Sequence, residues 1–341
     1  MAGYMNNYRS YRGKTPKWKV LLAVVLVLVI IASLAVMYLQ NYIVYDETGT
    51  PHFWLPEKET ESVEMPQRPA DLVVEEVPEP EVATVEYLAA AAVQTGAEAQ
   101  ELLTAAGESD GVILPLKGEE GKVFFRSQSA VSGAVQAADE TAQAIAAVVS
   151  RADSSAARLT CFLDPRATRM DARGMALLNI SGYLFYDGSN SCWLDPGKQP
   201  AREYLCALAS EAAQLGFDEL ILANVGYPTA GKLENIRYGE TEPEENLKAF
   251  LQELTAALEP YSTALTIEMS AGGILGGEEG KLSLALAAEF ASRIVAQVED
   301  EGDIEALSAA VTAANEETVF VPILTRPPET YQGSYILCQT T

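Results

Sequence analysis

The feature that most constrains the fold is a regular alternation of apolar strand-like runs with helix-like runs over most of the 341-residue chain. Strand-like runs lie at 85–91, 111–117, 158–164, 219–225, 264–270, 293–299, 319–325 and 334–338. Helix-like runs lie at 97–106, 134–149, 200–215, 244–258, 282–291 and 304–315. Parallel strands joined by crossover helices produce such an alternation. Eight units of this size predict an α/β fold, a (β/α)8 TIM-type barrel over residues 84–341.

The N-terminal region contains one uncharged apolar stretch, residues 20–39. At roughly 1.5 Å per residue it spans the roughly 30 Å hydrocarbon layer, which predicts a transmembrane helix. A cleaved signal peptide is the alternative, but its apolar region is usually about 7 to 15 residues long and ends in small residues. Residues 1–19 form a basic tail without acids, so the positive-inside rule places them in the cytoplasm. The expected protein is single-pass in the cell membrane, with its C-terminal domain extracellular.

The formal charge of −25 divides unevenly along the chain. Subtracting the +5 tail from −25 leaves −30 on the exported part, which repels nucleic acid and other polyanions. Residues 40–83 are predicted to form an extracellular stalk, because 56–82 is rich in Glu, Pro and Val. Before it, 41–45 and 53–55 form either a small hairpin or aromatic contacts with the membrane surface. The oligomeric state is left open.

Cysteine and histidine usage limits the possible chemistry. Cys161, Cys192, Cys206 and Cys338 all lie on the exported side, where three disulfide pairings are possible. Buried free thiols are the alternative, which we favour because Cys161, Cys206 and Cys338 lie in strand-like or helical settings. The single histidine, His52, precedes the stalk, which excludes a Ser-His-Asp triad or histidine-rich metal site in the barrel. No metal or cofactor is predicted.

The segment 216–228 reads GFDELILANVGYP and carries the most specific motif. It resembles the "GFDEIxFDYVRFP" strand of the "putative glycoside hydrolase" domain of bacterial cell-surface proteins, an alpha-amylase-like barrel. The flanks match, but Ala223 stands in place of an aspartate and Gly226 in place of an arginine.

Three other segments support this resemblance. GVILPLKGEEGKVFFRS from Gly111 resembles "VVIDVKDDSGxVxYKS", with Pro115 in place of the aspartate and Lys117 retained. ARLTCFLDP from Ala157 resembles "ARIVxFKDP", with Leu163 where a lysine is usual. WLDP at 193–196 resembles "WxNP" or "WxDP".

The resemblance implies where the chemistry would lie. Glycosidases use two carboxylates, one donating a proton and the other attacking or activating water. In alpha-amylase-like barrels the nucleophile follows strand four and the acid follows strand five, which correspond here to Ala223 and Glu268. The family aspartate and arginine are missing at Pro115 and Gly226, so the resemblance also implies a degenerate site.

Residues alternate faces along a strand, which predicts side-chain directions. In 264–270, the apolar Leu265, Ile267 and Met269 face the helices and Thr266, Glu268 and Ser270 face inward. In 158–164, Arg158, Thr160, Phe162 and Asp164 face inward, and so do Gln297 and Glu299 in 293–299.

The candidate catalytic residues are therefore Glu268 and Asp164. Each has a structural alternative, since Glu268 could be solvated at the rim and Asp164 could cap the turn at Pro165. The candidate sugar-contacting residues are Lys117, Arg158, Trp193, Asp195, Asn224 and Tyr227. Trp193 would serve as a stacking platform or as a lid. The glycine-rich segment 272–280 lacks the P-loop spacing and is expected to be a flexible rim loop.

Three hypotheses follow. The leading one is a membrane-anchored extracellular barrel that has lost hydrolysis and binds an envelope glycan or a surface partner. The second is an active glycosidase with Glu268 as the acid and Asp164 or Glu299 as the second carboxylate. The third is a structural envelope protein whose partner binds outside the mouth of the barrel.

Overall fold

The computed structural model describes residues 43–45, 51–53, 86–107 and 111–338. The chain divides into two compact units, Met1–Pro78 and Glu79–Thr341. In the first, β1 (Ile43–Tyr45) pairs antiparallel with β2 (Pro51–Phe53), as the hairpin alternative predicts. The apolar stretch 20–39 and the stalk segment 56–82 lie outside the described residues. Within those residues, no helix is long and apolar enough to cross a membrane.

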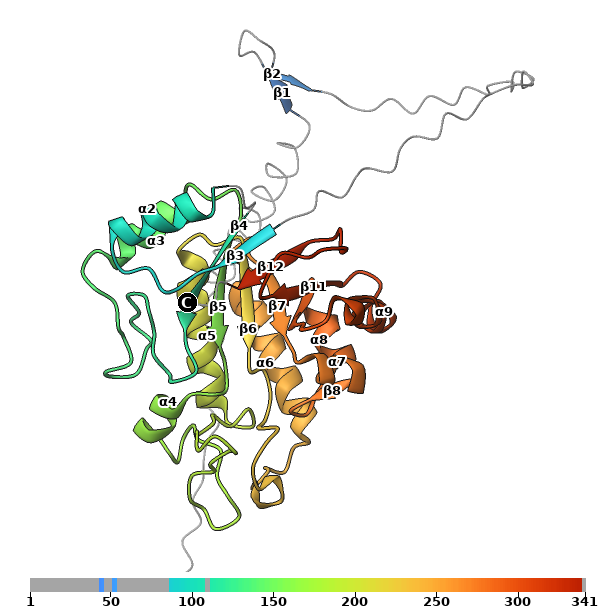
Figure 1. The fold of residues 1–341 in the computed structure, drawn as a ribbon. Coiled ribbons are helices and arrows are strands. Elements are labelled where there is room, and N and C mark those ends of the chain that lie inside the picture. Colours follow the sequence, from blue (N-terminus) through green and yellow to red (C-terminus); the bar gives the residue numbers. More distant parts are fainter. Residues whose placement is uncertain (1–42, 46–50, 54–85, 108–110, 339–341) are drawn as a thin grey trace, which may run out of the picture. The chain divides into compact units, whose positions relative to one another are not determined.

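The second unit is a closed barrel of eight parallel strands that follow one another in chain order. The strands are β3 (Glu86–Ala89), β4 (Gly111–Lys117), β5 (Ser155–Thr160), β6 (Glu219–Ala223), β7 (Ala264–Glu268), β10 (Arg293–Gln297), β11 (Val319–Leu324) and β12 (Tyr335–Cys338). The barrel closes where β12 pairs with β3, Tyr335 opposite Glu86. With its surrounding helices (Figure 1), this barrel has the (β/α)8 architecture expected from the sequence.

The helices lie around the strands. They are α2 (Gly96–Ala105), α3 (Thr141–Val149), α4 (Pro165–Met170), α5 (Gln199–Gln214), α6 (Pro243–Leu258), α7 (Ala271–Gly276), α8 (Leu284–Phe290) and α9 (Ile304–Ala314). Helix α5 packs along α6 (Figure 1), because both present a buried apolar stripe. The start predicted for α3, at 134, is wrong, because Gln136 donates its backbone N–H to Val123 rather than continuing the helix.

The described barrel has two apolar cores. The larger core lies between the strands and the helices. The smaller fills the barrel interior with Tyr87, Ile113, Ala156, Ile221, Val295, Val321 and Ile336. At the amino ends of the strands, Glu219 accepts hydrogen bonds from Arg293, at 2.8 Å, and from Thr266. This polar cluster occupies the barrel interior at the amino ends of the strands.

Two local predictions need correction or completion. The segment 272–280 is not a simple loop, because α7 and a hairpin of β8 (Glu278–Glu279) and β9 (Leu282–Ser283) order it. The prediction of buried free thiols is confirmed for Cys161 and Cys206 but wrong for Cys338, whose free thiol is exposed near the end of β12; Cys192 is also a buried free thiol. Burial raises the pKa of both Cys161 and Cys206 to about 12.

Candidate functional site

A cavity of about 460 Å³ opens at the carboxyl ends of β6, β7 and β10. Its main lining residues are Trp193, Asn224, Gly226, Tyr227, Glu268, Ser270, Glu279, Gln297 and Glu299. Barrel enzymes place their reacting groups at this end of the strands. The cavity is therefore the candidate site, and it gathers side chains from the β5, β6, β7 and β10 segments.

Glu268, the last residue of β7, forms a bidentate ion pair with Arg158 of β5 inside the barrel. Its Oε2 accepts from Nε at 2.7 Å and its Oε1 from Nη2 at 2.9 Å. Both side chains are partly exposed, 25% for Glu268 and 29% for Arg158. Burial alone would lower the pKa of Arg158, but the hydrogen bonds and charge of Glu268 outweigh it and raise that pKa. Both carboxylate oxygens thus act as acceptors.

The end of β6 carries no ionisable group where the family pattern has an aspartate. Ala223 is buried and pairs across the sheet with Thr160. The next residue, Asn224, lines the cavity with a left-handed φ of 53°, a conformation that costs free energy. Its Oδ1 is buried and, among the described residues, has no hydrogen-bond partner. Asn224 is therefore a strained polar group next to the cavity.

Trp193 and Tyr227 provide aromatic walls for the cavity. The Nε1 of Trp193 donates to Oδ2 of Asp187 at 2.8 Å, which fixes the indole. The hydroxyl of Tyr227 accepts from Nδ2 of Asn246 at 3.2 Å, and burial raises its pKa above the ordinary value. Both rings also belong to the apolar core, with Trp193 7% and Tyr227 2% exposed, so Trp193 offers more of its ring to the cavity than Tyr227 does.

Lys117 and Asp164 lie outside the cavity, in the layer between strands and helices. The register of β4 shifts between Pro115 and Lys117, so Lys117 pairs with the outward-facing Leu159. Strand β5 ends at Thr160, so the alternation that predicts an inward Asp164 does not continue to this residue. The predicted inward direction of Asp164 is therefore wrong.

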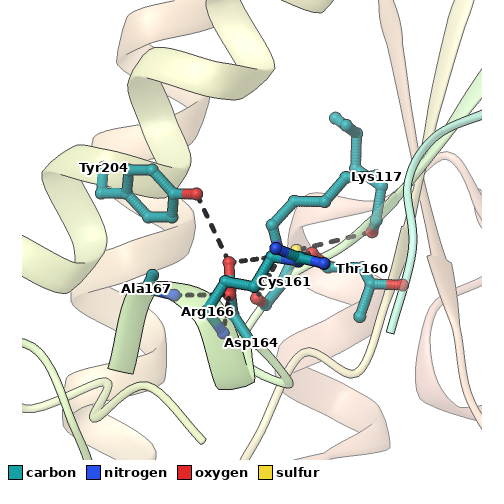
Figure 2. A network of polar contacts seen from close by, with 8 residues as sticks. Lys117, Thr160, Cys161, Asp164, Arg166, Ala167 and Tyr204 are labelled. Carbon is teal, nitrogen blue, oxygen red and sulfur yellow. Dashed lines mark hydrogen bonds and ion pairs between the residues drawn. The ribbon is translucent and has the colours of Figure 1, made fainter. Parts of the chain in front are cut away.

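The two side chains satisfy each other within the protein, as Figure 2 shows. The ammonium of Lys117 lies 3.0 Å from Oδ2 of Asp164 and also donates to the carbonyls of Thr160, at 2.6 Å, and Cys161, at 3.3 Å. The Oδ1 of Asp164 accepts from the backbone of Arg166 and Ala167, which caps α4. All three donors of the ammonium are used, which leaves none for a substrate.

Three further residues that the sequence analysis singled out do not line the cavity. Phe162 packs on Phe250 of α6 with ring centroids 4.8 Å apart, so its predicted inward direction is wrong. Asp195 is 8% exposed, and its Oδ1 accepts from the backbone of Gly197 at 3.0 Å. Burial raises its pKa. Pro115 pairs across the sheet with Arg158 and supplies no carboxylate.

Sequence reasoning did not assign a role to several residues that line the cavity. Ser270 and Gln297 face it from the positions that strand alternation predicts. Glu279 comes from the β8–β9 hairpin, whose only sequence signal is the two-residue turn Gly280-Lys281. In the described ranges no group of three or more side chains is arranged to hold a metal ion.

Comparison with solved structures finds the same fold in a glycoside hydrolase domain. The glycoside hydrolase domain of PgaB (BpsB) from Bordetella bronchiseptica is 12% identical, with a TM-score of 0.55 over 71% of this chain and 84% of that domain. A hypothetical protein from Ruminiclostridium thermocellum is 22% identical, with a TM-score of 0.46 over 53% of this chain and 96% of that protein. At these identities the likeness concerns the fold alone.

Comparisons of sequence identify the family. The search of curated proteins found no match. The profile of the family described as "Putative glycosyl hydrolase domain" matches residues 86–275, more than half of the chain, and covers the strands from β3 to β7. The chain therefore belongs to this glycosyl hydrolase domain family.

Proposed function

We propose that the barrel binds a glycan in the cavity at its mouth and does not hydrolyse it. The single observation that carries this proposal is the composition of the cavity, which keeps aromatic and polar sugar-binding groups next to Ala223. Sugar sites combine aromatic surface with a few placed hydrogen-bonding groups. Trp193, Asn224 and Gln297 are groups of this kind.

The contacts of Glu268 and Asp164 support the loss of hydrolysis. A glycosidase needs a protonated acid and a second carboxylate. Glu268 accepts two hydrogen bonds from Arg158, so in this arrangement both of its oxygens are engaged as acceptors. Asp164 is occupied by Lys117 and by the backbone of α4, and Ala223 has no reactive group.

A titration with glycan oligomers tests the binding proposal. The purified full-length protein is titrated with a panel of bacterial envelope and plant oligosaccharides, beside Trp193→Ala and Tyr183→Ala. Trp193→Ala should weaken binding about tenfold or more, because stacking area is lost. Tyr183 is 74% exposed and lies outside the cavity, so its variant is the matched control for loss of an aromatic ring. Equal affinities for wild type and Trp193→Ala would contradict the proposal.

An active glycosidase is the second candidate, and one observation favours it. Glu268 and Glu299 line the same cavity, so two carboxylates are available across the mouth. In this mechanism Glu268 would donate the proton after substrate binding separates it from Arg158. Hydrolysis by wild type that Glu268→Gln abolishes would establish this candidate.

We also propose that the barrel domain lies on the outer side of the cell membrane. Its support is the uncharged stretch 20–39 preceded by five cations and no acid. An envelope glycan would then be within reach of the barrel, and the acidic segment 56–82 would act as a spacer.

A further inference from the structure

The β8–β9 hairpin docks on the loop that follows β6, where the family pattern has an arginine. The backbone N–H of Tyr227 donates to the carbonyl of Gly280 at 2.7 Å. A Cβ on Gly226 would lie 2.8 Å from that same carbonyl oxygen. A side chain at Gly226 would therefore strike the hairpin backbone. The hairpin can dock in this position because Gly226 has no side chain where the family pattern has an arginine.

The turn of the hairpin is built for this contact. Gly280 and Lys281 have φ values of 55° and 69°, and two consecutive left-handed residues form the type I′ turn that closes a tight hairpin. A Cβ on Gly280 would lie 2.3 Å from the carbonyl oxygen of Tyr227, so only glycine fits. The position of the hairpin over the mouth is thus fixed by close backbone contact.

The hairpin presents its two glutamates to different surroundings. Glu279 lines the mouth cavity together with Glu268, and its Oε2 accepts from the backbone N–H of Ser270. Its Oε1 has no hydrogen-bond partner among the described residues. The neighbouring Glu278 is exposed, lies 3.7 Å from Lys281 and lines a separate groove beside α6 and α8. Glu279 is therefore the member of the pair that a ligand in the cavity can reach.

We infer that Glu279 is an acidic ligand-binding group of the site and takes over ligand contacts from the carboxylate that is absent at Ala223. This inference rests on the proposed glycan-binding function. The bond from Ser270 holds one oxygen in place and leaves the other to accept from a sugar hydroxyl or ammonium. A charge-assisted hydrogen bond of this kind is about twice as strong as a neutral one.

The charge of the cavity defines the class of sugar. Its lining includes Glu268, Glu279 and Glu299, but no lysine or arginine belongs to the described lining residues. Arg158 forms its ion pair with Glu268. The remaining carboxylates repel an anion, so the ligand is an uncharged or amino sugar rather than a uronic acid.

The test compares isosteric variants of the two hairpin glutamates in the full-length protein. Wild type, Glu279→Gln and Glu278→Gln are titrated with hexamers of N-acetylglucosamine, glucosamine, glucose and galacturonic acid. Glu279→Gln should weaken the affinity for whichever hexamer the wild type binds about tenfold, because one charge-assisted hydrogen bond is lost. Glu278→Gln should bind like wild type, and the galacturonic acid hexamer should not bind.

A second variant tests the docking of the hairpin without changing Glu279. Gly226→Ala places a methyl against the carbonyl of Gly280 and should displace the hairpin, with a loss of affinity similar to that of Glu279→Gln. Thermal unfolding checks that each variant is folded.

The outcomes separate the inference from the function on which it rests. Equal affinities for wild type and Glu279→Gln, with loss in Trp193→Ala, would overturn the inference and leave glycan binding intact. Tight binding of the galacturonic acid hexamer would also overturn it. A wild-type protein that binds none of the four hexamers would contradict the proposed function and this inference with it.

Discussion

At the scale of single residues, two ion pairs of the same chemistry have different surroundings. Lys117 and Asp164 are 1% and 0% exposed, and backbone groups use their remaining hydrogen-bonding capacity. Arg158 and Glu268 are about a quarter exposed and end beside the cavity. The first pair can only stabilise the fold, whereas the second can respond to a ligand.

Removal of the buried carboxylate should destabilise the domain strongly. Asp164→Ala leaves the ammonium of Lys117 buried without its partner and removes the cap of α4, so the free energy of unfolding should fall by about 3–5 kcal/mol. Urea denaturation measures this loss. The control is Asp139→Ala, which breaks the exposed ion pair with Arg126 and should leave stability nearly unchanged. A loss below about 1 kcal/mol for Asp164→Ala would contradict the structural role.

At the scale of elements, the Glu301 carboxylate holds the loop before β12. It accepts hydrogen bonds from the backbone of Glu329, Thr330 and Tyr331, which lower its pKa from 4.5 to about 2. Because the pKa is lower in the folded state, the stabilising contribution is present above about pH 4.5 and is lost as the pH falls toward 2.

The pH dependence of unfolding checks this contribution. Glu301→Gln should lower the unfolding temperature at pH 7, and its difference from wild type should narrow as the pH falls below the ordinary value of 4.5. The control is Glu317→Gln. Glu317 is exposed, and its carboxylate accepts no hydrogen bond from the backbone of another loop among the described residues. A difference that stays constant with pH would refute the assignment.

Regular strands could be predicted from the sequence, whereas their irregular ends could not. The eight apolar runs located all the barrel strands, and alternation gave the right direction for Glu268 because β7 is regular up to that residue. It failed at Asp164, because the early end of β5 depends on contacts between strands. The family resemblance made Lys117 a candidate sugar contact, but a register shift in β4 places it outside the cavity. Glu279 could not be assigned either, because its hairpin is placed by contact with Tyr227 and Gly226.

At the scale of the whole molecule, the charge and the N-terminal stretch are the basis of the proposed membrane topology. The proposed topology predicts that full-length protein sediments with membranes and resists carbonate extraction, and that deletion of residues 1–39 releases it. In intact cells, an added protease should digest the barrel, because it would lie outside. A barrel protected until the cells are broken would contradict this topology.

The central claim is that the cavity binds a glycan without cleaving it. Its most direct test is product analysis after long incubation of the full-length protein with every oligosaccharide it binds, beside Glu268→Gln. The expected result is saturable binding with no product from wild type, because Ala223 offers no nucleophile and Glu268 is paired with Arg158. Cleavage by wild type that Glu268→Gln abolishes would contradict the claim and establish an active glycosidase.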